Sequence, residues 1–123
     1  MPNFKIDRTT EDIRRELSDI FRTLKDPRVS SELLSIVRIE LTNDMSYCKV
    51  YVSAIEGMDR SKEAVRGLKS ASGYIRRELA LRLHLRHTPE LRFIADDSIA
   101  HGSQINKLLS ELVRSDEDEQ NNS

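Results

Sequence analysis

The chain has 123 residues, 37% of them hydrophobic, and a formal net charge of −1 at pH 7. This length suits one domain with a single, mostly aliphatic core, since Trp is absent. No apolar run approaches the roughly 20 residues of a membrane-spanning helix, one cysteine cannot form an internal disulfide, and the N-terminus is not signal-like. The composition therefore predicts a soluble, cytoplasmic protein and excludes a membrane-spanning or disulfide-rich secreted one.

The first predicted element is an amphipathic helix over Arg8 to Leu24, whose apolar residues recur at helical spacing. Thr9 or Thr10 is available as its N-cap. Asp26-Pro27-Arg28 ends the helix, because the residue before a proline is disfavoured in the α region.

Two runs of alternating apolar and polar residues then predict a β-hairpin. The runs are Leu34 to Leu41 and Tyr47 to Ile55, joined by a short polar segment. In the first run the inward-facing residues are Val37, Ile39 and Leu41. Cys48 belongs to the inward set of the second run, which favours a small buried side chain over a nucleophile.

After the hairpin, a helical period predicts a long helical region that Asp59 or Ser61 can cap. Its apolar side consists of Ala64, Val65, Leu68, Ala71, Ile75, Leu79 and Leu83. The period continues through Gly73, so periodicity alone does not demonstrate a break there. A mid-helix glycine costs about 1 kcal/mol relative to alanine, so its presence needs a reason.

The last elements are a short strand and a helix. Thr88-Pro89 ends the preceding helix, and the strand is read from the alternation of Leu91, Phe93 and Ala95. Asp96-Asp97-Ser98 caps a helix over 99 to 114, whose domain-facing residues are Ile105, Leu108, Leu109 and Leu112. The order α-β-β-α-α-β-α predicts one α+β domain over residues 1–115. The acidic segment 116–123 is predicted to be a disordered tail, because it has nothing to bury.

Basic residues concentrate in the second helical region. Between Arg60 and Arg92 there are nine Lys or Arg against three Glu, whereas the whole chain has 20 against 21 acids. One face of a helical wheel carries Lys62, Arg66, Lys69, Arg76 and Arg77, with Gly73 in the middle of it. A missing Cβ lets a backbone N–H approach a phosphate oxygen while cations neutralise its charge. A close-packing glycine beside a solvated charged face explains the same pattern equally well.

No motif supports catalysis. His84 and His87 could present two imidazoles to one metal, but no further ligand stands at a supporting spacing. Neither a phosphate loop nor a dinucleotide-binding glycine motif occurs. The chain is therefore predicted to be a binding protein, not an enzyme, with no metal and no cofactor.

The order of elements, with a basic junction between two helices, resembles a type II KH domain with a three-stranded sheet. KH modules clamp single-stranded nucleic acid with a GXXG loop, and Ala71-Ser72-Gly73 stands in its place here. Further matching segments are Asp26-Pro27-Arg28, Lys49-Val50-Tyr51-Val52, and Pro89-Glu90-Leu91-Arg92-Phe93 leading to Asp96 and Ser98. In this combination the chain resembles the ribosome-binding factor A family over about residues 8 to 114.

The resemblance implies a bacterial or organellar assembly factor that binds the small ribosomal subunit and its ribosomal RNA. It would act in the cytoplasm late in subunit maturation and help to process the 5′ end of that RNA. It implies a kink at Ala71-Ser72-Gly73, and this RNA-contacting junction is extended by the wheel to Lys62, Arg66, Lys69, Arg76 and Arg77. Arg82 and Arg86 join this set if the kink turns the second helix. We expect a monomer without membrane association, with other assembly factors as further partners.

The sequence leaves two alternative functions open. In the first, the protein is an adaptor whose basic helix face binds an acidic protein partner. In the second, it is a small metal-dependent hydrolase that uses His84 and His87.

Overall fold

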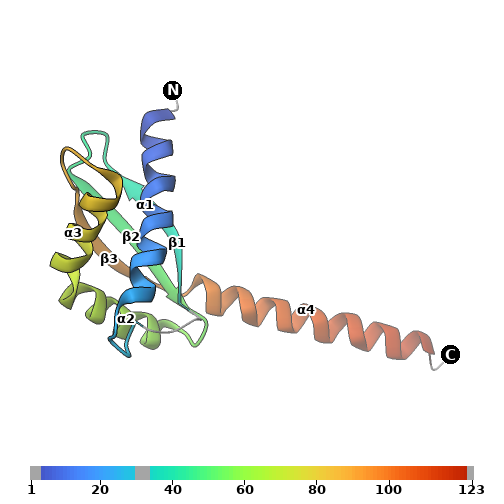
Figure 1. Ribbon diagram of the computed structural model, residues 1–123. Helices are drawn as coiled ribbons and strands as arrows, with labels where there is room; N and C mark the ends of the chain where they lie inside the picture. Colours follow the sequence, from blue (N-terminus) through green and yellow to red (C-terminus); the bar gives the residue numbers. More distant parts are fainter. Residues whose placement is uncertain (1–3, 30–33, 122–123) are drawn as a thin grey trace.

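The computed structural model describes the backbone of residues 4–29 and 34–121 and the side chains of residues 6–29 and 34–113. The elements are α1 (Phe4–Thr23), β1 (Leu34–Leu41), β2 (Tyr47–Ala54), α2 (Met58–Ser70), α3 (Ser72–Leu83), β3 (Glu90–Asp96) and α4 (Ser98–Asn121) (Figure 1). The predicted α+β class and the predicted order of elements are confirmed.

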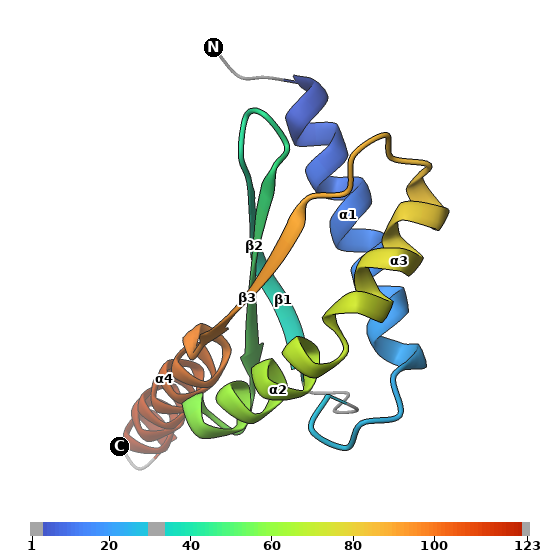
Figure 2. The same cartoon turned by 90° about the vertical axis from the view of Figure 1, so that its left-hand side faces the viewer.

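The sheet has three strands in the order β1-β2-β3. β1 and β2 are antiparallel, as expected of a hairpin, whereas β2 and β3 are parallel. A parallel pair needs a long crossover connection, and α2 and α3 provide it. Helices α1 and α3 lie against one face of the sheet (Figure 2), while α4 leaves from the far end of β3 and extends away from the domain (Figure 1).

The core lies between this sheet and the helices α1, α2 and α3. Its fully buried members include Ile13 and Leu17 of α1, Val50 of β2, Leu68 of α2 and Ile75 of α3. The whole apolar set expected of the second helical region packs into or against this core, except that Ala64 is buried outside the cluster.

Strand β1 contains a bulge that the simple alternation did not predict. The register shifts between Ile36 and Arg38, which pair with consecutive residues of β2. The side chains packed on the core are therefore Leu34 and Ile36 before the bulge and Ile39 and Leu41 after it, so the assignment of Val37 to the inward set is wrong. One extra residue in a strand lets two apolar pairs of opposite phase reach the same face.

The start of α1 also differs from the prediction. The helix begins at Phe4, so Thr9 and Thr10 lie inside it and do not cap it. The Thr10 hydroxyl donates to the backbone oxygen of Ile6 at 2.8 Å, an i to i−4 bond that is compatible with a helix interior.

Helix α4 corrects two expectations. Its apolar residues Ile105, Leu108, Leu109 and Leu112 do not face the domain, because each is between 45% and 63% exposed. The helix also runs to Asn121, so the backbone of residues 116–121, which we expected to be disordered, is helical. Residues 122 and 123 lie outside the described part of the chain. Treating 1–115 and 116–123 as separate units stays a prediction.

Candidate nucleic-acid interface

The long helical region breaks at a single residue, Ala71. Its backbone angles are φ −97° and ψ 8°, which lie outside the helical region. Its N–H donates to the carbonyl oxygens of Gly67 and Leu68, which ends α2, and its own carbonyl accepts the N–H of Ile75 at 2.9 Å, which starts α3. The kink that periodicity left open and the resemblance implied is therefore present.

The residues of the junction divide between core and solvent. Ala71 packs against the core, whereas Gly73, the second residue of α3, is exposed. A Cβ built on Gly73 would meet nothing within 4 Å, and the residue does not have a positive φ. Neither internal packing nor backbone conformation therefore requires glycine at this position.

The start of α3 has backbone caps only. No side chain in the described residues caps it, and backbone N–H groups of the junction donate to the carbonyl oxygens of Gly67, Leu68 and Lys69 at the end of α2. Ser72 lies half-buried at this start, beside the exposed Gly73. The junction thus combines a helix start without a side-chain cap with a residue that has no side chain to cover its backbone.

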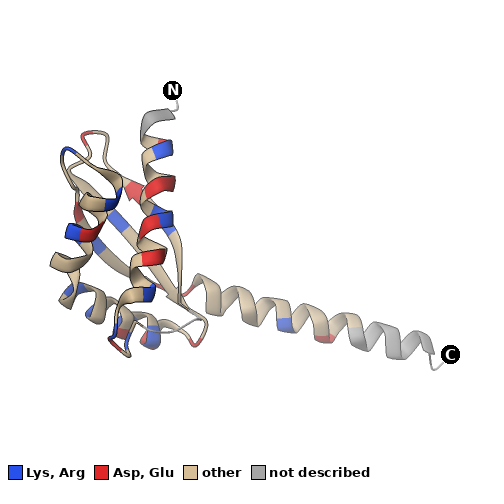
Figure 3. Cartoon of the chain, in the orientation of Figure 1, with Lys and Arg blue, Asp and Glu red and all other residues tan. Residues whose placement is uncertain are grey.

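Lys and Arg positions recur along α2 and α3 on both sides of the junction (Figure 3). The exposed cations predicted from the sequence are Lys62, Arg66, Lys69, Arg76 and Arg77. None of the five forms an ion pair with a carboxylate of the described residues. Arg76 donates to the backbone oxygen of Thr88 at 2.7 Å, which ties it to the loop before β3 without neutralising it. Arg86 is exposed beyond the end of α3 and is likewise unpaired within the described residues.

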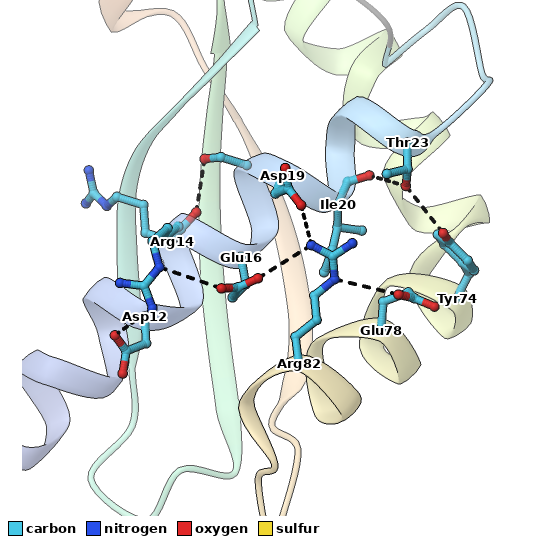
Figure 4. A network of polar contacts seen from close by, with 11 residues as sticks. Asp12, Arg14, Glu16, Asp19, Ile20, Thr23, Tyr74, Glu78 and Arg82 are labelled. Atoms are coloured by element: carbon cyan, nitrogen blue, oxygen red, sulfur yellow. Dashed lines mark hydrogen bonds and ion pairs between the residues drawn. The ribbon is translucent and has the colours of Figure 1, made fainter.

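Arg82 behaves differently from the other predicted cations. Its guanidinium lies 2.5 Å from a carboxylate oxygen of Asp19 and 3.4 Å from one of Glu16, both on α1, and 3.6 Å from one of Glu78 on its own helix (Figure 4). Hydrogen bonding to Asp19 is the main cause that raises the pKa of Arg82. The structure therefore uses Arg82 to hold α3 against α1.

The turn after α1 helps to position α2. Asp26 accepts the backbone N–H of Arg28 at 2.9 Å and its guanidinium at 2.7 Å. The hydrogen bond from the Arg28 side chain is the main reason that the pKa of the Asp26 carboxyl is lowered. The side-chain pairing closes the turn at Pro27, where the sequence predicted the end of the first helix.

Gly67 is the contact between this turn and α2, and it was not among the residues predicted to matter. A Cβ at Gly67 would lie 2.7 Å from Cγ2 of the buried Val29. Next to this contact, Arg60 of α2 donates to the Pro27 carbonyl at 2.9 Å. The available signal was the helix penalty of a second mid-helix glycine, one residue before the apolar Leu68.

The histidines and the cysteine were the remaining candidates for a metal site or a nucleophile. His84 is exposed and ends α3 in a left-handed conformation, with φ 51° and ψ 41°. Across the described residues, no group of three or more His, Cys, Asp or Glu could hold a metal ion. Cys48 is buried, and burial raises the pKa of its thiol to about 12. Within the same residues, no helix has the length and apolarity to span a bilayer.

Comparison with known proteins identifies relatives over most of the chain. The family model of ribosome-binding factor A matches residues 5–109. The ribosome-binding factor A of Acetivibrio thermocellus is 47% identical over 108 residues, which cover 87% of each chain. The crystal structure of ribosome-binding factor A from Thermus thermophilus matches with a TM-score of 0.64 and 29% identity, covering 72% of this chain and 92% of that one.

A third match is a homology model of the Thermus thermophilus factor that was fitted into a cryo-EM map of a complex of that factor with the 30S subunit. It has a TM-score of 0.58 and 30% identity and covers 70% of this chain and 89% of that one. Sequence and structure agree over the same region, and the chain belongs to the ribosome-binding factor A family.

Proposed function

We propose that this protein binds the small ribosomal subunit late in its maturation and contacts ribosomal RNA through the α2–α3 junction. Family membership supports the choice of partner, as does the relative that was fitted into a map of a 30S complex. We further propose that this binding assists the processing of the 5′ end of the small-subunit RNA.

The observation that carries the proposal is the distribution of unpaired charge. Lys69, Arg76 and Arg77 lie on the two sides of the exposed Gly73 and have no carboxylate partner among the described residues. Phosphate contacts are made by such cations together with backbone N–H groups at helix N-termini. Arg82 is left out of the proposed interface because three carboxylates already surround it.

The position of the junction supports the same assignment. In a KH module the loop between two consecutive helices clamps the nucleic-acid backbone. The break at Ala71, followed by Ser72 and Gly73, lies between the corresponding helices here. A glycine with open space where its Cβ would be leaves room for a phosphate to approach the backbone.

The direct test measures binding of the full chain to purified free small subunits over a range of salt concentrations. A triple variant, Lys69→Ala, Arg76→Ala and Arg77→Ala, should bind more weakly. The logarithmic slope of affinity against salt should also flatten by about one unit for each cation that no longer neutralises a phosphate. A matched control replaces the exposed Arg8, Arg15 and Lys107, which lie off the junction.

Unchanged affinity of the junction variant, or an equal decrease in the control, would refute the assignment of the interface. Nuclease digestion of the captured complex separates RNA binding from the adaptor reading, because an acidic protein partner would survive it. The processing proposal is tested in cells that lack the protein. Small-subunit RNA with an unprocessed 5′ end should accumulate there, and the parent chain but not the junction variant should restore processing.

A further inference from the structure

Figure 2 shows α1 and α3 on one side of the sheet. The opposite face carries a cluster of side chains that the proposed interface does not use. On β2 the outward positions are Tyr47, Lys49 and Tyr51, which alternate with the buried Cys48 and Val50. In the described part of the chain, α4 is the helix that leaves on this side, and its start lies over the end of β2, where the N–H of Ile99 donates to Ser53. No helix of the described residues covers the rest of this face.

Two arginines from the neighbouring strands lie over the two tyrosines. The guanidinium carbon of Arg38 on β1 is 4.2 Å from the ring centre of Tyr51. That of Arg92 on β3 is 4.4 Å from the ring centre of Tyr47. The strand pairing explains both contacts, since Arg38 pairs directly with Tyr51, and Arg92 pairs with Lys49, two residues from Tyr47.

Further contacts fix one of these stacks. Arg38 Nε lies 3.2 Å from a carboxylate oxygen of Glu40, and the hydroxyl of Tyr51 donates to the other oxygen at 3.2 Å. The side chain of Arg38 is nevertheless 60% exposed, and Tyr47 is 40% exposed. The planar groups are thus held against the sheet with an outer surface open to solvent.

The chemistry of these groups selects a class of ligand. Aromatic rings and guanidinium planes are the side chains on which unpaired nucleobases stack. Lys49 lies between the two tyrosines, and neither Lys49 nor Arg92 has a carboxylate partner among the described residues. With strand residues about 3.3 Å apart, the two rings are separated by about 13 Å along β2, which is far enough to stack separate bases. Unpaired cations between them match the anionic backbone of the same strand.

We propose that this surface, the tyrosine–arginine platform of Arg38, Tyr47, Lys49, Tyr51 and Arg92, binds unpaired bases of single-stranded RNA. It is a second contact on the other side of the sheet from the α2–α3 junction. Identifying its RNA as ribosomal rests on the proposed function, whereas the stacking chemistry does not. Together the two surfaces would bind RNA from both faces of the domain.

The test uses the full chain and a dye-labelled single-stranded RNA oligonucleotide at low salt. Fluorescence anisotropy of the dye gives the affinity. The double variant Tyr47→Leu and Tyr51→Leu should bind about 5- to 150-fold more weakly for each base that no longer stacks. The matched variant Tyr47→Phe and Tyr51→Phe keeps both rings and should bind as the parent does, although it lacks the hydroxyl that donates to Glu40.

Intrinsic fluorescence provides a second readout, because the chain has three tyrosines and no tryptophan. In a Tyr74→Phe background the remaining signal comes from the two platform tyrosines, and RNA should quench it. Arg92→Lys offers a variant that keeps the charge and the fold but removes the planar group. It should weaken oligonucleotide binding more than Arg15→Lys, a matched change at an exposed position on α1.

Several outcomes would overturn the platform. One is a leucine variant that binds RNA as tightly as the parent. Another is a phenylalanine variant whose affinity decreases as much as that of the leucine variant. A third is an Arg92→Lys variant that binds RNA as the Arg15→Lys control does. The variants are also tested on nuclease-treated subunits. If binding to their proteins depends on the two rings while binding to RNA does not, the ligand of this surface is a protein and not RNA. If the parent does not bind small subunits but binds the oligonucleotide through both tyrosine rings, the proposed function is refuted and the platform stands. If subunit binding depends on the junction while oligonucleotide affinity does not depend on the two tyrosine rings, the proposed function stands and the platform is refuted.

Discussion

Replacing Gly73 by alanine should make the domain more stable and its binding weaker. The residue lies in α3 without a positive φ, and an added Cβ would meet nothing within 4 Å. The substitution therefore removes the helix penalty of glycine without creating a clash. Any decrease in binding must then arise on the partner's side of the surface.

Both effects can be given a size. A Gly to Ala change at a compatible helical position stabilises by about 0.4–1 kcal/mol, which for a domain of this size raises Tm by roughly 2–4 °C. If the added methyl blocks one hydrogen bond between the backbone and a phosphate, binding becomes weaker by about 1.5–3 kcal/mol. That change is roughly a 10- to 150-fold weaker affinity.

The assay measures thermal unfolding and small-subunit affinity on the same sample. Gly102→Ala is the matched control, because Gly102 also lies in a helix, α4, and its added Cβ would also meet nothing within 4 Å. The control should bind as the parent does. A Gly73→Ala variant that binds as tightly as the parent would refute the role of the junction, as would equal weakening of both variants.

Four further outcomes are expected. Gly67→Ala should destabilise the fold by up to about 2 kcal/mol in denaturant titration. Overpacking costs about 1–3 kcal/mol, of which the higher helix propensity of alanine offsets about 1 kcal/mol. A rise in stability would contradict the clash with Val29. Arg82→Gln should lower Tm and leave the salt dependence of binding unchanged, because its partners are internal carboxylates. Hydrogen bonds from the neighbouring hydroxyls lower the pKa of Asp44 from 3.8 to about 2. The stabilisation by the ionised carboxylate is therefore complete above about pH 4 and disappears as the pH falls through 2. The Tm of Asp44→Asn should be lower than that of the parent at pH 7, and the two Tm values should converge below pH 2. Cys48 should resist thiol reagents at pH 8 until the protein is unfolded, because burial raises its pKa to about 12.

Periodicity predicted the fold where a single face of each element packs on the core. The apolar positions Leu68, Ile75 and Leu79 are all fully buried, although a break at Ala71 lies between the first two. The break occupies one residue, so the period on either side stays nearly in phase. For the same reason the sequence predicted the packing of α2 and α3 correctly and left the kink between them undecided.

The sequence pattern could not predict the bulge in β1 or the direction and length of α4. In β1, register is decided by pairing with β2, and a rule of strict alternation cannot place the extra residue between Ile36 and Arg38. In α4, the spacing of Leu108, Leu109 and Leu112 indicates an apolar face but does not identify what packs on it. Those side chains remain exposed in the described structure. The helix continues past residue 114 to Asn121, and no proline or glycine after Gly102 interrupts it.

The candidate site shows the same limit in terms of charge. The sequence places Arg77 in the basic set and adds Arg82 if the kink turns the second helix, but it cannot show how each is paired. In the described structure Arg77 has no carboxylate partner, whereas Arg82 is surrounded by carboxylates. The deciding acids, Glu16 and Asp19, lie more than 60 residues earlier in the chain. Tertiary pairing thus occupies acidic groups on α1, and the cations beside Gly73 have no carboxylate partner among the described residues. A chain with a net charge of −1 can therefore present a basic surface, and the pairing in the structure decides which of the candidate cations to mutate.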